Sequence, residues 1–187
     1  MILDSDTNIV FLADTLPVRH PEFFARFTSI LNQSCITYAL IPGTKDIWAV
    51  DYMPIQVSKE KFVQFSYNPD YLRNSKWWRE TIPDVDAICS KMGITTVKSD
   101  IVLDGGNVIR WRDKVIMTEK VFKENPHFTQ DNLTTELKAL FEVDKIIFIP
   151  QQPYDYIGHA DGMIRFVACD TILVNDYSRE SRAFQRR

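Results

Sequence analysis

Residues 104–119 read Asp-Gly-Gly-Asn-Val-Ile-Arg-Trp-Arg-Asp-Lys-Val-Ile-Met-Thr-Glu, so that an acidic, glycine-rich turn precedes a short apolar run. The run is rich in apolar and β-branched residues and polar at its end, as a buried strand is. Four runs of this kind start 53, 53 and 57 residues apart, and they cover Ile9–Ala13, Phe62–Ser66, Val115–Glu119 and Ile172–Asp176. This regular spacing indicates an internal repeat.

A helix and a further strand complete the predicted repeat unit. Apolar residues at helical spacing follow Pro21 and begin again at Val85 and Leu133, and Gly93 is placed to end the second helix as a C-cap. Ser178 is placed to cap a fourth helix. The strands expected after the three complete helices are Ile36–Ile41, Ile94–Val97 and Lys145–Pro150. We therefore predict an α/β fold of ββαβ-like units of about 53 residues, packed around a shared core.

Composition limits the classes of function. The chain has 187 residues, of which 45% are hydrophobic and 25% charged, as in a globular domain. A net charge of −3 and the lack of a basic stripe argue against nucleic-acid binding through phosphates. No apolar run reaches the roughly 18 residues of a membrane span. The acidic N-terminus and three widely spaced cysteines favour a cytoplasmic protein.

Three aspartates stand in the same register of the repeat. Asp51, Asp104 and Asp161 each lie eleven residues before an apolar run. If the units surround an axis, equivalent positions converge on it. His159 lies two residues before Asp161, and on extended backbone the two side chains point to the same face.

Each motif also has a structural interpretation. Asp-Gly-Gly between apolar runs is typical of a hairpin turn, and its glycines indicate positive φ or a close approach of the backbone. Trp48 and Pro54 around Asp51 are compatible with a purely structural role, and His-x-Asp alone is weak evidence. The shared register favours function. Carboxylates that face one pocket need a cation between them, and a guanidinium group pairs with carboxylates through two bonds at a time.

The motifs resemble those of the agmatine deiminase / bacterial peptidylarginine deiminase family. The resemblance is carried, in family order, by Trp48…Asp51-Tyr52-Met53-Pro54, by Asp104-Gly105-Gly106-Asn107, and by Gly158-His159-Ala160-Asp161-Gly162 with Arg165-Phe166-Val167 after it. It implies a pentein-like α/β propeller of five ββαβ units with the active site at the centre. Roughly three and a half units fit into this chain, which would make residues 1–187 a single, incomplete pentein domain.

The resemblance also implies roles. His159 and Asp104 would be catalytic, the histidine as general acid and base and the aspartate as the group that orients it. Asp51, Asp161 and Trp48 would bind the substrate, an agmatine-like guanidine of putrescine and polyamine biosynthesis or an arginyl peptide. A cysteine thiolate would release ammonia through a thiouronium intermediate. No metal or organic cofactor, nucleic acid or membrane is implied, and a homo-oligomer is compatible with the sequence.

Three residues depart from the family pattern. Val50 stands where the family has arginine, Met53 where it has glycine, and Asp104 where it has glutamate. The aspartate is one methylene shorter, roughly 1.5 Å, which would lengthen or remove its contact to His159. These changes bear on whether agmatine itself is the substrate.

No cysteine of this chain is placed to be the nucleophile. Cys89 lies on an apolar helical stripe, Cys35 joins a helix to a strand, and Cys169 falls in a predicted hairpin turn on the far side of a strand from His159. The family nucleophile lies far beyond Gly-His-x-Asp. Five units would need roughly 265 residues. We therefore expect a chain that is truncated before the catalytic cysteine and inactive as given.

Three other interpretations remain open. A pentein-like module could bind a partner without catalysis. A metallohydrolase could use His159, Asp161, Asp51 and Asp104 as ligands for Mn²⁺ or Mg²⁺. An amidinotransferase of the same superfamily would need the same nucleophile.

Overall fold

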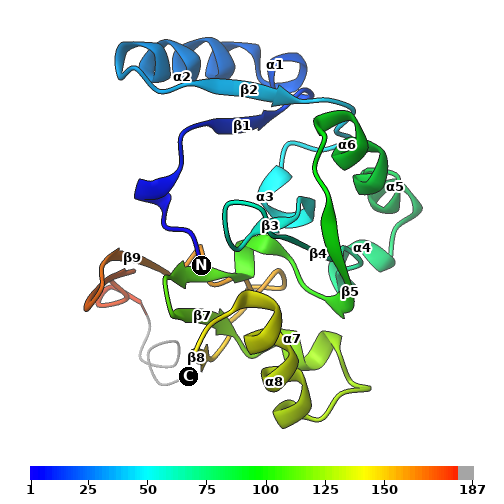
Figure 1. The fold of residues 1–187 in the computed structure, drawn as a ribbon, viewed down its shortest axis with the longest axis vertical. Coiled ribbons are helices and arrows are strands. Elements are labelled where there is room, and N and C mark those ends of the chain that lie inside the picture. Colours follow the sequence, from blue (N-terminus) through cyan, green and yellow to red (C-terminus); the bar gives the residue numbers. More distant parts are fainter. Residues whose placement is uncertain (181–187) are drawn as a thin grey trace.

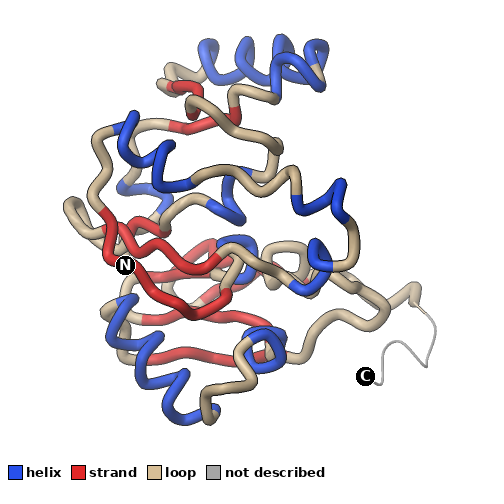
Figure 2. Tube along the Cα trace, turned by 90° about the vertical axis from the view of Figure 1, so that its right-hand side faces the viewer, coloured by secondary structure: helices blue, strands red, loops and turns tan. Residues whose placement is uncertain are grey.

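The computed structural model describes residues 1–180 and places four small sheets one after another along an open arc (Figure 1). Turned by 90°, the strands lie above one another through the middle of the molecule, with helices at the edges (Figure 2). The strands are β1 (Val10–Ala13), β2 (Tyr38–Ile41), β3 (Ile55–Gln56), β4 (Phe62–Ser66), β5 (Thr96–Val102), β6 (Ile109–Trp111), β7 (Lys114–Thr118), β8 (Lys145–Ile149), β9 (Ile164–Ala168) and β10 (Thr171–Val174).

The sheet topology repeats from unit to unit. In the two central sheets an antiparallel hairpin, β3–β4 or β6–β7, is followed by a helical segment and a parallel strand, β5 or β8. Within the described residues the first sheet shows the parallel pair β1–β2, and the last shows the hairpin β9–β10. The four apolar runs correspond to β1, β4, β7 and β10. The predicted ββαβ repeat is therefore confirmed, with two units complete among residues 1–180.

The three predicted helices are present where the apolar stripes placed them. They are α2 (Pro21–Gln33), α6 (Val85–Met92) and α8 (Gln130–Phe141). Gly93 ends α6 in the left-handed conformation at φ 68°, and Thr129 caps α8 by accepting a hydrogen bond from the backbone N–H of Asn132. Ser178 lies in a turn, and the fourth helix predicted after it falls largely outside the described residues.

Shorter helices connect these elements. They are α1 (Leu16–Arg19), α3 (Ala49–Tyr52), α4 (Asp70–Arg73), α5 (Lys76–Arg79) and α7 (Lys120–Glu124), together with the 3₁₀ turns η1 (Asp4–Asp6) and η2 (Gly105–Asn107). No helix in residues 1–180 has the length and apolar character needed to cross a membrane.

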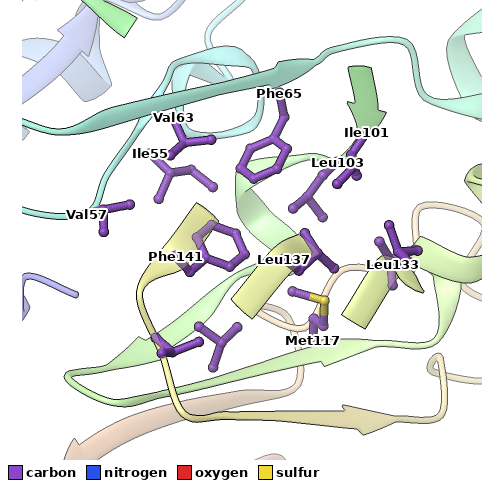
Figure 3. Close-up of a cluster of buried hydrophobic side chains, with 13 residues drawn as sticks. Ile55, Val57, Val63, Phe65, Ile101, Leu103, Met117, Leu133, Leu137 and Phe141 are labelled. Carbon is purple, nitrogen blue, oxygen red and sulfur yellow. The ribbon is translucent and has the colours of Figure 1, made fainter. Parts of the chain in front are cut away.

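The main hydrophobic core joins the second and third units. Phe141 and Leu137 of α8 are fully buried against Val63 of β4 and Met117 of β7, and the rings of Phe65 and Phe141 lie 5.3 Å apart (Figure 3). Burying a side chain of this size contributes roughly 1.5–3 kcal/mol. The core shared between units, which the repeat predicted, therefore joins β3–β5 to β6–β8 and α8.

Candidate active site

Four polar side chains from three successive units converge near one glycine. Asp51 lies on α3, Asp104 immediately precedes η2, and His159 and Asp161 lie on the loop between β8 and β9. A Cβ atom added to Gly106 would lie 2.6 Å from Asp51 Oδ1, 2.6 Å from His159 Nδ1 and 3.0 Å from Asp161 Oδ2. The three aspartates, which share one register of the repeat, are therefore brought together by the fold.

The Asp-Gly-Gly motif does not form the predicted hairpin turn. Its glycines instead allow other segments of the chain to come close to the backbone. Its two glycines belong to η2, whereas the β6–β7 hairpin turns at Arg112, whose φ is 36°. A Cβ on Gly105 would meet the backbone oxygen of Val50 at 1.9 Å. The left-handed glycines of the described chain are Gly43, Gly93 and Gly158, so of the two predicted reasons for glycine here only close approach applies.

His159 is held by the carboxylate of Asp104. The ring Nε2 lies 2.8 Å from Asp104 Oδ2, and the hydroxyl of Tyr71 donates to the same oxygen at 2.9 Å. The shorter aspartate thus still reaches the histidine, contrary to the expectation of a lost contact. Because an ionised carboxylate only accepts hydrogen bonds, this pairing assigns the ring proton to Nε2. The other nitrogen, Nδ1, then faces Asp51, whose Oδ1 is 3.6 Å away.

Burial and charge tune the two groups that face each other. Burial raises the pKa of Asp51 to about 6, and the negative charges of Asp104 and Asp161 add to this, while His159 and the backbone N–H of Gly106 oppose it. Burial alone would lower the pKa of His159, but the hydrogen bond to Asp104 and the charges of Asp51 and Asp161 raise it above its ordinary value. Both groups therefore have a pKa shifted upward by their surroundings, as acid–base groups of active sites often have.

The loop that carries His159 is fixed by backbone contacts. Thr118 Oγ1 donates to the carbonyl of Gly158 at 2.6 Å, and the N–H of Asp161 donates to the carbonyl of Gly106 at 3.1 Å. Residues 160–162 form a bend and turn, so the predicted extended backbone is wrong. Both side chains nevertheless lie beside Gly106.

A cavity of about 540 Å³ opens over these residues, with Asp51, His159 and Asp161 in its lining. Trp48, a predicted substrate-binding residue, also lines it and is 60% exposed. Further aromatic side chains, which the sequence motifs did not predict, complete the wall of the cavity. They are Tyr67, Tyr71, Trp77, Trp78 and Tyr156. The feature of the sequence that could have indicated this wall is the pair Trp77–Trp78, which stands in a polar stretch.

The cavity is acidic. Asp46 and Asp155 join Asp51 and Asp161 in its lining. The one lysine or arginine among the described lining residues is Arg19, which is paired with Asp46 at 3.1 Å. A cation with an apolar stem fits such a surface, because carboxylates attract its charge and aromatic rings cover its stem.

The three cysteines lie outside the cavity lining. Cys89 is buried on α6 and packs as a core residue, Cys35 is exposed after α2, and Cys169 is exposed in the β9–β10 turn, each in the predicted setting. Nor do residues 1–180 contain a group of three or more His, Cys, Asp or Glu side chains arranged to hold a metal ion. The metallohydrolase interpretation thus gains no supporting observation.

Comparison with solved structures defines the class of fold. The C. jejuni agmatine deiminase superposes with a TM-score of 0.71 at 18% identity, covering 96% of this chain and 65% of that one. The DDAH from Pseudomonas aeruginosa superposes with a TM-score of 0.56 at 10% identity, covering 96% and 73%. The chain therefore has the pentein fold that the resemblance predicted.

The family follows from the sequence. The model of the Porphyromonas-type peptidyl-arginine deiminase family matches residues 14–186, and the chain belongs to this family. A Photobacterium profundum protein provisionally named agmatine deiminase is 27% identical over 140 residues, which are 67% of this chain and 38% of the relative. The agmatine deiminase of Medicago truncatula is 33% identical over 82 residues, 40% of this chain and 22% of the relative. The chain thus spans well under half of these two relatives.

Proposed function

We propose that the cavity is a guanidinium-binding site of the deiminase type. The observation that carries the proposal is the convergence of Asp51, His159 and Asp161 beside Gly106, with Asp104 behind the histidine. Two carboxylates beside one another in a partly buried cavity need a cation, and the planar guanidinium group offers each of them a pair of N–H donors. The substrate would lie between Asp51 and Asp161.

His159 would act as the general acid and base. Its Nε2 is occupied by Asp104, which leaves Nδ1, on the Asp51 side, to exchange protons. The imidazolium would protonate the departing ammonia, and the neutral ring would then take a proton from the attacking water. Asp104 would hold the ring in the required tautomer, and Trp48 would cover the stem of the substrate.

The thiouronium step of this proposal needs a thiolate that none of the three cysteines of this sequence supplies at the cavity. We therefore expect the 187-residue polypeptide to bind guanidines without releasing ammonia from them.

The charge of the cavity favours one type of substrate tail. The carboxylate of free arginine would meet Asp46 and Asp155, whereas the amine of agmatine would be attracted to them. Agmatine-like guanidines are therefore the proposed substrate class, and an arginyl peptide, whose carboxylate is masked, is the next candidate. A role in polyamine formation would follow from agmatine as substrate.

Calorimetric titration tests the proposal. Wild-type chain should bind agmatine and exclude free arginine, and Asp51→Asn and Asp161→Asn should each lose binding while the protein stays folded by circular dichroism. Absence of binding for all guanidines would favour the non-catalytic module instead. Ammonia release that depends on His159 would contradict the expected inactivity of this polypeptide.

A further inference from the structure

One buried cation near the site has no role in the chemistry proposed so far. Lys120, the first residue of α7, is only 2% exposed, although lysine is rarely buried without several partners. Its ammonium lies 3.2 Å from Asp70 Oδ1 and 3.6 Å from Glu124 Oε1. An apolar residue could fill this part of the core without charged partners. The contacts of the ammonium therefore indicate the role of Lys120.

The ammonium is linked to His159 and to Asp104, in each case through another residue of the chain. It donates to the carbonyl of Ile157, two residues before His159 on the same loop. It also lies 4.5 Å from the centroid of the Tyr71 ring, whose hydroxyl donates to Asp104 Oδ2. A cation on the face of a phenol ring stabilises the ring's position, and the cation–π attraction is larger where water is excluded.

We propose that Lys120 is a positioning residue for His159. On one side, it fixes the loop before the histidine by its hydrogen bond to Ile157. On the other side, it holds the Tyr71 ring, whose hydroxyl donates to the same oxygen of Asp104 that contacts His159. Within residues 1–180, Asp104 Oδ1 is buried without a hydrogen-bond partner, so the hydrogen bonds that orient this carboxylate there are those to Oδ2. The ammonium thereby keeps the ring proton of His159 on Nε2 and Nδ1 towards the cavity. This role rests on the proposed function only for its use in catalysis, since the contacts that carry it are formed by the chain's own residues.

The test is the tautomer of His159, read from the ¹⁵N shifts of the imidazole at a pH where the ring is neutral. The other two histidines, His20 and His127, are exposed and serve as internal references. Wild-type protein should show the Nε2–H form for His159. Lys120→Met keeps most of the stem and removes the charge, and it should give a mixture of the two tautomers. Lys59→Met, which changes an exposed lysine between β3 and β4, is the control and should leave the wild-type form.

A lysine that only stabilises the fold would lower the melting temperature of Lys120→Met without changing the tautomer in the folded protein, and this result would overturn the proposal. If Lys120→Met fails to fold, Tyr71→Phe tests the second arm of the same arrangement, because it keeps the ring and removes the hydroxyl. It too should lose the single tautomer, and retention of it would equally overturn the proposal.

Agmatine titration separates this proposal from the proposed function. Affinity should fall on the order of tenfold in Lys120→Met, the size typical for an outer partner of a binding group. A wild type that binds no guanidine, combined with a tautomer change in Lys120→Met, would reject the binding function and keep the positioning role. If wild type binds agmatine and Lys120→Met changes neither the tautomer nor the affinity, the binding function is kept and the positioning role is rejected.

Discussion

Asp51 and His159 come from two units that flank a third, and Oδ1 of the aspartate lies 3.6 Å from Nδ1 of the histidine. The two side chains come from α3 and from the β8–β9 loop, and the backbone of Gly106 lies between their units. Each has a pKa above its ordinary value. A site with this arrangement is expected to make both ligand binding and the stability of the fold depend on pH.

Removing the charge of Asp51 should stabilise the protein at neutral pH. Because the folded state raises the pKa of Asp51 from 3.8 to about 6, the folded state binds the proton more tightly, and stability falls as pH rises from about 4 to 6. The ionised Asp51 therefore lowers the free energy of unfolding at pH 7 by at most roughly 3 kcal/mol. Asp51→Asn should therefore unfold at a higher urea concentration than wild type at pH 7 but not at pH 3.5, where both are neutral. Equal midpoints at both pH values would contradict this.

Guanidine binding should follow the ionisation of the same group. A guanidinium group needs the charged carboxylate, so agmatine affinity should fall as pH drops below about 6. Calorimetric titration between pH 5 and 8 measures this. Binding that is constant across the range would show that Asp51 is not a partner of the cation.

The pKa of His159 should depend on Asp104. The carboxylate keeps the histidine basic, so Asp104→Asn, which removes the negative charge, should lower the pKa of His159. The stability linked to this pair is present below pH 6.5 and is lost as pH rises through the higher folded pKa. NMR titration of the ring measures the shift. The exposed Asp100→Asn should leave the titration of His159 unchanged.

The fold was predictable because its signals are local and repeated. The runs at β1, β4, β7 and β10 recur at a nearly constant spacing, and Gly93 and Thr129 mark helix ends through backbone chemistry that acts within a few residues. Strand boundaries shifted by one or two residues in most cases, because pairing with the neighbouring strand, and not composition, decides where a strand ends.

The polar centre of the site was predictable in outline, and the cavity wall was not. The register of Asp51, Asp104 and Asp161 follows from the repeat. Tyr71 and Lys120 carry no such signal, because the contact of Tyr71 with Asp104 and that of Lys120 with the Tyr71 ring arise from packing between units. The turn at residues 160–162 was missed for a related reason: the glycines permit it, but the contact of Asp161 with Gly106 selects it.

Trp48 should contribute to binding and not to stability. Its side chain is 60% exposed and lines the cavity, so Trp48→Ala should weaken agmatine binding by about 3- to 30-fold, the size of a cation–π contact of roughly 0.5–2 kcal/mol. The melting temperature should stay close to that of wild type. Phe23→Ala, which removes an exposed ring on α2 outside the cavity lining, is the control and should bind agmatine normally. Unchanged affinity in Trp48→Ala would remove Trp48 from the site.

A single methyl group at position 106 should disable the site. In Gly106→Ala the new Cβ would lie 2.6 Å from both Asp51 Oδ1 and His159 Nδ1, so the two side chains must separate or the η2 backbone must move. Overpacking of this kind costs roughly 1–3 kcal/mol. Gly162→Ala is the matched control for stability, because its Cβ would have nothing within 4 Å and its φ lies outside the left-handed region. Urea unfolding of both variants should show loss of stability for Gly106→Ala alone, and agmatine titration should show loss of binding for Gly106→Ala. Equal behaviour of the two variants would mean that the close approach of the three units at Gly106 is not what forms the site.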